Sequence, residues 1–264
     1  MKTTRLLACA AIAALALGAA GVSTSYVTPA IAQAAQDDTI ATTNGNLVIH
    51  PIHHAAVMLT FGGKRIFIDP APPQGAPQGS DPVPEYKAMP APDAILITHI
   101  HPDHFNVPIL TAISGPNTTI IVPQNVFDML PDALKAKAKV MKNGDKMNVA
   151  GVAVEAVAMY NTSADRLMYH PKGLGNGYVL TMGGKRVYLA GDTEETPELK
   201  NLPNIDVAFI PMNLPYTETV DAAANWVKDF KPKIVYPYHY GMSDVNAFKT
   251  AVGNASDVRL RKWY

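Results

Sequence analysis

The chain has 264 residues, of which 48% are hydrophobic and 17% are charged, so it is long and apolar enough to build a sizeable core. Its 22 Lys and Arg residues balance its 22 Asp and Glu residues, and the sequence contains no basic run. This balance excludes the basic surface that nucleic acid or an anionic membrane requires, and we expect neither as a partner.

The first 32 residues predict a secretory signal peptide. Lys2 and Arg5 precede an apolar run over residues 6–22, and Ala30-Ile31-Ala32 is a small-x-small cleavage pattern. A transmembrane anchor is the alternative, but the run is short for a span of about 20 residues. Cys9, the only cysteine, lies inside this segment, so the mature chain has no thiol for disulfides or metal binding. We therefore expect a periplasmic or secreted protein with no stable membrane anchor after cleavage.

The remaining elements follow in chain order. Residues 33–45 are polar and rich in alanine, and they predict a flexible mature N-terminus. From residue 46 to 264, short apolar segments bounded by Gly, Pro and Asp predict one α/β domain. The predicted strands are 46–52, 55–61, 65–69, 94–98, 119–122, 152–159, 177–182, 186–190, 207–210 and 234–236. Helices are predicted over 107–112, 126–137 and 219–230, and a surface loop over 71–92. Gly62-Gly63 and Gly183-Gly184 each predict a hairpin turn, which suggests two similar halves.

The segment Thr98-His99-Ile100-His101-Pro102-Asp103-His104 comes at the end of the predicted strand 94–98. It holds three of the eight histidines of the chain and one carboxylate. Imidazole and carboxylate suit zinc and similar ions, and α/β folds commonly place their sites at strand ends. His99 and His101 can chelate one ion, while Asp103 and His104 follow a bend and can address a second. A polar surface loop would not explain this density of ligand types, so we predict a metal site.

Two further strand ends carry ligand types. Gly191-Asp192-Thr193 follows the predicted strand 186–190, and His239 follows the strand 234–236. Each is a weak signal alone, because Asp and Thr often cap helices and a single histidine is usually structural. Together with the histidine-rich segment, Asp192 can bridge two ions and His239 can be a further ligand.

In this order the motifs resemble those of the metallo-β-lactamase superfamily, from about residue 46 to 241. The resemblance implies an α/β fold, a four-layer αββα sandwich of two mixed sheets with helices outside. It also implies two divalent metal ions. The ligands would be His99 and His101 for the first ion, Asp103, His104 and His239 for the second, and Asp192 between them. Asp69, also at a strand end, would brace the motif from behind. His54-Ala55 and His170-Pro171-Lys172-Gly173 look like the ascorbate-lactonase-like bacterial branch, which is related to the N-acyl phosphatidylethanolamine phospholipases.

The chain departs from the family pattern at Tyr160-Asn161, where the family has another histidine for the first ion. His170 comes nine residues later, in a glycine-containing loop that can approach a site closely. Either His170 is the missing ligand, or it contacts substrate or supports the structure and the first ion has fewer ligands. His53 and His54 point to opposite faces of a strand, so at most one faces the site. We expect His54 and Asn161 to lie behind the ligands or against the substrate.

The predicted activity is hydrolysis of a small-molecule ester, lactone or phosphodiester by a metal-activated hydroxide. Asp103 is the predicted catalytic residue, which orients the hydroxide and accepts its proton, and nearby cations keep Asp192 ionised. We expect zinc, although manganese, iron and nickel accept the same donors. A non-catalytic metal-binding or sensing protein on the same fold and a β-lactam hydrolase are the alternatives, and the oligomeric state stays open.

Overall fold

The computed structural model describes residues 37–77 and 79–264, so the predicted signal peptide lies outside the described part of the chain. The described residues form two seven-stranded sheets, one after the other along the sequence. The first sheet contains, in spatial order, β1 (Asp38–Thr42), β2 (Gly45–His53), β3 (Ala56–Phe61), β4 (Lys64–Ile68), β5 (Ala94–Leu96), β6 (Thr119–Val122) and β7 (Ala138–Val140). The second contains β14 (Asp257–Val258), β13 (Ile234–Tyr238), β12 (Val207–Pro211), β11 (Lys185–Leu189), β10 (Gly175–Met182), β9 (Val152–Met159) and β8 (Lys146–Val149).

Both sheets follow the same plan. In the first sheet, neighbouring strands pair antiparallel from β1 to β4 and parallel from β4 to β7. In the second sheet, they pair antiparallel from β8 to β11 and parallel from β11 to β14. The predicted glycine turns occupy equivalent places, Gly62-Gly63 between β3 and β4 and Gly183-Gly184 between β10 and β11. All four glycines have positive φ, which the turns of two-residue hairpins require. The two similar halves suggested by these turns are therefore present in the fold.

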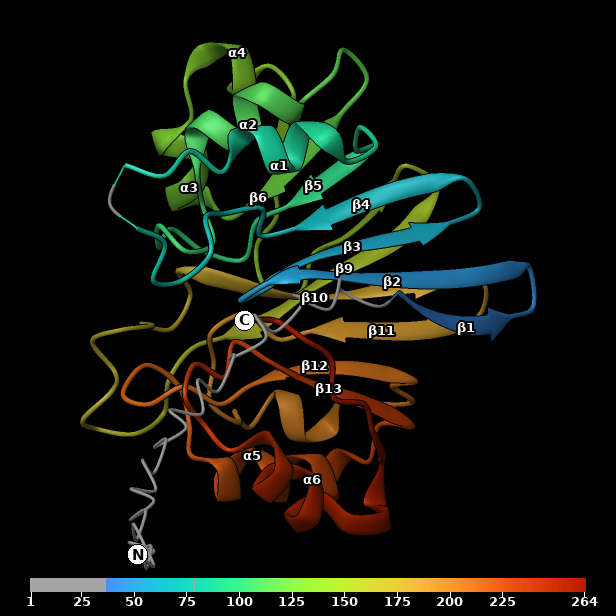
Figure 1. Cartoon of the computed structure of the whole chain (residues 1–264), viewed down its shortest axis with the longest axis vertical. Coiled ribbons are helices and arrows are strands. Elements are labelled where there is room, and N and C mark those ends of the chain that lie inside the picture. The colour runs from blue at the N-terminus through green and yellow to red at the C-terminus, as the bar shows by residue number, and fades with distance from the viewer. Residues whose placement is uncertain (1–36, 78) are drawn as a thin grey trace, which may run out of the picture. The chain divides into compact units, whose positions relative to one another are not determined.

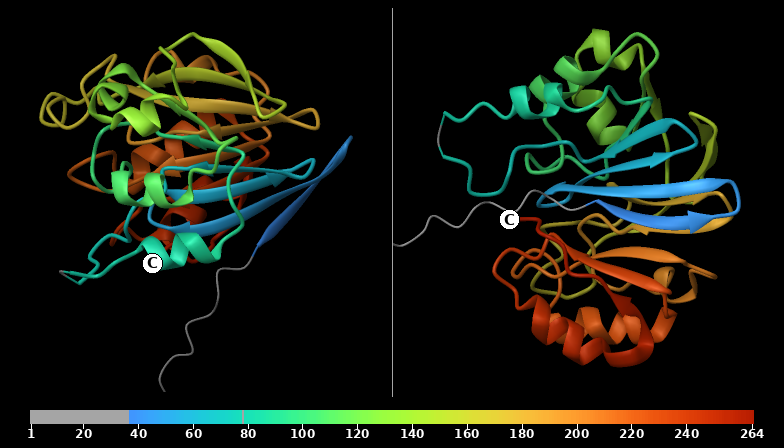
Figure 2. Two further views of the ribbon diagram at one scale, coloured as in Figure 1. Left: turned by 90° about the horizontal axis from the view of Figure 1, so that it is seen from above. Right: turned by 45° about the vertical axis from the view of Figure 1, so that its right-hand side comes forward.

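Helices cover the outer faces of both sheets (Figures 1 and 2). The first sheet carries α1 (Val83–Ala88), α2 (Val107–Ile113), α3 (Gln124–Met129) and α4 (Asp132–Lys135), and the second carries α5 (Val220–Phe230) and α6 (Val245–Val252). Two 3-10 turns, η1 (Leu199–Asn201) and η2 (Gly253–Ala255), complete the helical elements of the described residues. One apolar cluster lies between the sheets and one lies under each helical layer. The predicted four-layer αββα sandwich is therefore confirmed.

The inner parallel strands β5 and β12 are buried on both faces, whereas the edge strands β7 and β14 are partly exposed. All five residues of β12 are buried, as expected for a strand with a sheet on one side and helices on the other. Helix α5 packs Trp226 and Val227 against this side of the sheet, and its first turn is capped by the Thr219 hydroxyl, which accepts a hydrogen bond from the Ala222 amide. The rigid strands hold the loops at their carboxyl ends in place.

The structure corrects four element predictions. Strand β1 lies inside the segment predicted to be flexible, because Asp38 and Ile40 are buried while their neighbours are exposed. Helix α1 lies within the predicted loop 71–92. The predicted helix 126–137 is two short helices, since Pro131 has no amide hydrogen and the preceding Leu130 is extended. Helix α6 was not predicted. None of the described helices is long and apolar enough to cross a bilayer.

Candidate metal centre

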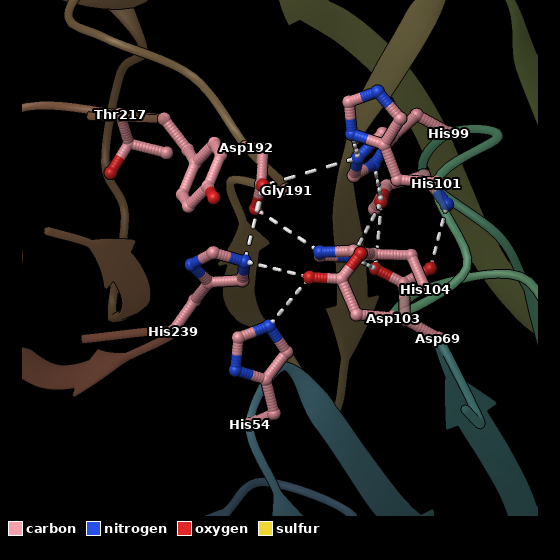
Figure 3. A network of polar contacts seen from close by, with 12 residues as sticks. His54, Asp69, His99, His101, Asp103, His104, Gly191, Asp192, Thr217 and His239 are labelled. Carbon is pink, nitrogen blue, oxygen red and sulfur yellow. Dashed lines mark hydrogen bonds and ion pairs between the residues drawn. The ribbon is translucent and has the colours of Figure 1, made fainter. Parts of the chain in front are cut away.

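The predicted site residues meet at one end of the two sheets, on loops that follow strands (Figure 3). Asp69 follows β4, the His99–His104 segment follows β5 closely, and Asp192 and His239 come after β11 and β13. His54, Asp69 and His239 have φ of 53°, 46° and 46°, a left-handed conformation that non-glycine residues rarely adopt. Such residues cost on the order of 1 kcal/mol or more each and are retained where the surrounding structure holds them. Here the amide of His239 donates to the carbonyl of His54, at 3.0 Å.

Eight side chains form two groups of four possible metal ligands. The His170 group contains His99, His101, His170 and Asp192, and the His54 group contains His54, Asp103, His104 and His239. Within each group, one ligand atom from every residue lies within 4.8 Å of the others. Six of the eight side chains are buried, while His101 and Asp103 are partly exposed, so the groups face solvent on the side of these two residues.

Asp192 lies between the two groups (Figure 3). Its Oδ1 is 3.2 Å from Nε2 of His104, and its Oδ2 is 3.1 Å from Nε2 of His239. The same Oδ2 is 3.3 Å from Nε2 of His170, in the other group. Asp192 therefore contacts histidines of both groups, so two ions held by these groups would share it as a ligand, in line with the prediction for Asp192.

Hydrogen bonds behind the rings of His104 and His170 turn Nε2 of each toward the centre. The buried Asp69 carboxylate accepts from Nδ1 of His104 at 2.8 Å, and from the amide and the hydroxyl of Thr98, both at 2.7 Å. Nδ1 of His170 donates to the Tyr216 carbonyl at 3.1 Å. A donated Nδ1–H leaves Nε2 free to bind a metal, which is the usual arrangement of metal-bound histidine. Asp69 therefore has the bracing contacts that the resemblance implies.

His170 lies in the same group of possible ligands as His99 and His101, the pair for which the resemblance implies a third histidine. Tyr160 turns away from the site, and its hydroxyl donates to Glu198 at 2.8 Å. Asn161 lies behind His170: its Nδ2 donates to the Tyr216 carbonyl at 2.7 Å, and its amide donates to the His170 carbonyl at 2.9 Å. Of the two alternatives left open by the sequence, the geometry favours His170 as a ligand, with Asn161 supporting its loop.

Four buried atoms at the centre have no hydrogen-bond partner: Nε2 of His104, His170 and His239, and Oδ1 of Asp192. Unsatisfied buried polar atoms are costly and rare, and here they converge on one point. Nitrogen and carboxylate donors in this number and spacing fit divalent metal ions of the zinc type. The residues present therefore suit the metal that the sequence predicts.

The electrostatics of the centre also favour positive charge. Burial lowers the pKa of His239, but the nearby Asp192 and Asp103 carboxylates outweigh it and raise the pKa to about 9. Burial likewise lowers the pKa of His104, yet Asp192 and Asp69 hold that pKa well above its usual value. Burial raises the pKa of Asp192, but the charges of His239 and His104 keep it well below its ordinary range. An ionised, buried carboxylate of this kind stabilises a cation beside it.

His54 is closer to the centre than the sequence indicated. Its Nε2 is 2.9 Å from Oδ2 of Asp103, and its Nδ1 is 2.7 Å from the hydroxyl of Tyr264. Burial lowers the pKa of His54 to about 4, which keeps the ring neutral and able to bind a metal. Sequence reasoning missed Tyr264, because no motif marks it and 210 residues separate it from His54. It also missed Glu194, whose carboxylate holds the His170 loop through the amides of Thr162 and Ser163.

Comparisons with known proteins agree with this architecture. The sequence model of the beta-lactamase superfamily domain matches residues 48–239. A UPF0173 metal-dependent hydrolase from Methanoregula boonei is 31% identical over 223 residues, covering 78% of this chain and 90% of the relative. A similar protein from Pyrococcus abyssi is 30% identical over 219 residues, covering 79% of this chain and 93% of the relative.

Solved structures show the same fold. A metal-dependent hydrolase from Parabacteroides distasonis is 42% identical and superposes with a TM-score of 0.77, covering 86% of this chain and 98% of that chain. Igni18, a metallo hydrolase from Ignicoccus hospitalis, is 23% identical with a TM-score of 0.66 and supports the fold alone. The match over most of the domain, together with the two groups of ligands at the strand ends, shows that the chain belongs to the metallo-β-lactamase superfamily and is a metal-dependent hydrolase.

Proposed function

We propose that this protein is a dinuclear hydrolase of small esters, lactones or phosphodiesters that acts through an activated water. The observation that carries the proposal is the position of Asp192, which belongs to the His170 group and also lies 3.2 Å from His104 and 3.1 Å from His239 of the His54 group. A single structural metal would need only one such group, and it would be closed to solvent. The partly exposed His101 and Asp103 instead line a pocket of about 360 Å³ that gives access to the centre.

The side chains of the pocket have separate roles in this reaction. Divalent ions, when bound, lower the pKa of a coordinated water and polarise the oxygen of the substrate. Burial raises the pKa of Asp103, but hydrogen bonds with His239 and His54 outweigh it and lower the pKa below its usual range. Asp103 therefore stays ionised at the edge of the pocket, where it orients the attacking water and accepts its proton. His104 and His239 stabilise negative charge on Asp192 and position it.

Metal analysis of the purified full chain, combined with a hydrolysis screen, tests the proposal. We expect about two ions per chain and hydrolysis of at least one class among lactones, esters and phosphodiesters. His101→Ala and Asp192→Asn should each lose metal and at least 100-fold in activity. His50→Ala and Asp165→Asn are matched controls outside both groups, and they should retain both properties.

The outcomes separate the proposal from its alternatives. One ion or none, with no hydrolysis, favours a non-catalytic metal-binding protein. Hydrolysis confined to β-lactams favours a β-lactam hydrolase. Full activity in a metal-free Asp192→Asn protein would contradict the enzymatic mechanism itself.

We also propose that the protein is exported to the periplasm or secreted. The support is the basic start, apolar run and cleavage pattern over residues 1–32. N-terminal sequencing of the protein from fractionated cells tests this, with Gln33 expected as the first residue. Full-length protein confined to the cytosol would contradict it.

A further inference from the structure

A second pocket adjoins the candidate metal centre. It has a volume of about 240 Å³ and is lined on one side by His99, His101 and His170. The rest of the lining is mainly apolar, with Asn125 as its one polar amide: it consists of Ile100, Asn125, Met159, Met168, Tyr169, Pro171, Leu174 and Gly175. His101 and Tyr169 line both this pocket and the larger one at Asp103 and Asp192, so the two are continuous. We call the second one the Met168 pocket.

Two of its apolar side chains are unusually exposed. Met168 is 76% exposed and Leu174 is 49% exposed, although both border a hollow beside buried metal-ligand candidates. Single exposed apolar residues need no explanation, but two on one wall of a pocket mark a surface for an apolar ligand. Gly175 lets Met159 pack into this wall, because any other residue at position 175 would place its Cβ 2.4 Å from the methyl carbon of Met159.

The described residues that line the two pockets include no Lys and no Arg. The cations that precede and follow Tyr169 in the loop are already paired: Nε of Arg166 is 2.5 Å from Glu194, and Nζ of Lys172 is 2.6 Å from Glu198. A substrate with a free phosphate or carboxylate away from the reacting centre would therefore find no partner here. Arg and Lys are the residues that normally recognise such groups.

We propose that the substrate is an uncharged ester or lactone with an apolar chain, which lies in the Met168 pocket while the reacting carbonyl lies beside Asp192. This inference rests on the proposed hydrolysis. The oxygen of water forms a bond to the acyl carbon, the acyl C–O bond breaks, and the departing alkoxide oxygen takes up a proton. The pocket of about 240 Å³ is smaller than the roughly 300–1,000 Å³ of pockets for drug-sized ligands, which suits a chain of several carbons better than a larger group.

Paired substrates test the assignment on the metal-loaded full chain. We expect kcat/KM for para-nitrophenyl octanoate to exceed that for the acetate by at least about 10-fold, and γ-decalactone to exceed γ-valerolactone similarly. Comparison of the ester pair with the lactone pair shows whether the reacting carbonyl belongs to an open-chain ester or to a lactone. Faster hydrolysis of bis(para-nitrophenyl) phosphate than of either long-chain carbonyl substrate would overturn the inference and leave the hydrolase intact, as would equal rates within both pairs.

Two variants of the Met168 pocket test where the apolar chain of the substrate lies. Met168→Gln and Leu174→Asn should each reduce the ratio of octanoate to acetate hydrolysis at least about 5-fold. Met129→Gln is the matched control, because Met129 is also exposed but lines neither pocket. If both pocket variants keep the wild-type preference for long-chain substrates, the apolar chain of the substrate lies elsewhere and the proposal is overturned.

A binding measurement separates this inference from the proposed function. Octanamide is uncharged and needs no catalysis, and calorimetry should detect its binding to the wild-type protein more strongly than that of acetamide. Met168→Gln should weaken this difference. If no ester or lactone is hydrolysed but octanamide binds in this way, the hydrolase proposal fails while the apolar pocket stands. If octanamide binds no better than acetamide, the pocket assignment fails.

Discussion

Asp69 shows how one buried carboxylate can determine the state of a neighbouring histidine. Its three accepted hydrogen bonds come from Thr98 and His104, and the side chain has no contact with solvent. Because a carboxylate can only accept, Nδ1 of His104 must carry a hydrogen. Nε2 is then the nitrogen available to a metal, so Asp69 acts on the centre without touching it.

Asp69→Asn should therefore weaken metal binding in the His54 group. The amide nitrogen of asparagine is a donor, and opposite Nδ1 of His104 it would favour the tautomer with a hydrogen on Nε2. We expect a loss of about 10–100-fold in the affinity of one ion. Competition with a chelator measures it, and Asp165→Asn is the control. Two ions held as tightly as in the wild type would show that the tautomer is fixed by other contacts.

The residues at strand ends could be predicted from the sequence, and those brought in by packing could not. His99, His101, Asp103, His104, Asp192 and His239 each come after a buried strand, so local pattern and spacing indicate them. Tyr264 reaches His54 only because the chain returns between the sheets after β14, and no local pattern encodes that return. His170 is intermediate, because its loop is visible in the sequence but its direction is set by Tyr216.

At the scale of elements, the first part of the loop between β9 and β10 is anchored by the side chain of Glu194. Glu194 accepts from the amides of Thr162 and Ser163, both at 2.6 Å, and from Nε of Arg166 at 2.5 Å. Burial raises the pKa of Glu194, but these hydrogen bonds outweigh it and keep the pKa below its usual value. The loop thus depends on an ionised carboxylate from the strand-end segment that also carries Asp192.

Glu194→Ala should release this loop. Removal of the carboxylate leaves two amides and the Arg166 guanidinium without their acceptor, at a cost of about 3 kcal/mol in the free energy of unfolding. We expect faster proteolysis between residues 162 and 174 and weaker metal binding by the His170 group. Glu85→Ala is the control, since the Glu85 side chain is 49% exposed and lies on α1, outside this loop. Equal protease resistance in the two variants would contradict this role of Glu194.

Strand β1 depends on a second buried carboxylate. Burial raises the pKa of Asp38, but hydrogen bonds from Tyr236 and Arg259 and the charge of Arg261 lower it below 3.8. A lowered pKa stabilises the fold above the unfolded value of 3.8, and this stabilisation is lost as the pH falls through the folded value. These partners lie on β13 and beyond β14, so the sequence near residue 38 does not reveal them.

Asp38→Asn should therefore destabilise the protein by about 2 kcal/mol at pH 7. The difference between the two proteins should shrink as the pH falls below the unfolded value of 3.8 and through the lower folded value, because the wild-type carboxyl then becomes protonated as well. Urea unfolding at pH 7 and at pH 3 measures the effect. A difference that stays constant with pH would mean that the ionised carboxylate is not responsible.

At the scale of the whole molecule, both ligand groups exist only when the two halves are together. The His54 group takes three residues from the first half and His239 from the second, and the His170 group takes two from each half. Ions that bind these groups bind the native state and not the unfolded chain. Bound metal should therefore stabilise the complete fold by mass action.

Removal of metal should accordingly lower the melting temperature. At a free ion concentration about 100 times the dissociation constant, each ion contributes about 2.7 kcal/mol, which corresponds to several degrees for a domain of this size. Scanning calorimetry with and without a chelator measures the change. The combined His101→Ala and Asp192→Asn variant should respond much less, and an equal response there would point to a chelator effect unrelated to the centre.

The connection between the sheets has a consequence for assembly. Only residues 141–145 link β7 to β8, and each half already has its own sheet and its own helical layer. If the chain were divided in this link, the two polypeptides would each expose the inner face of a sheet and an incomplete set of ligands. Their association would then depend on the concentration of free metal. The fraction of reassembled protein would measure this concentration, so the divided chain could serve as a metal sensor.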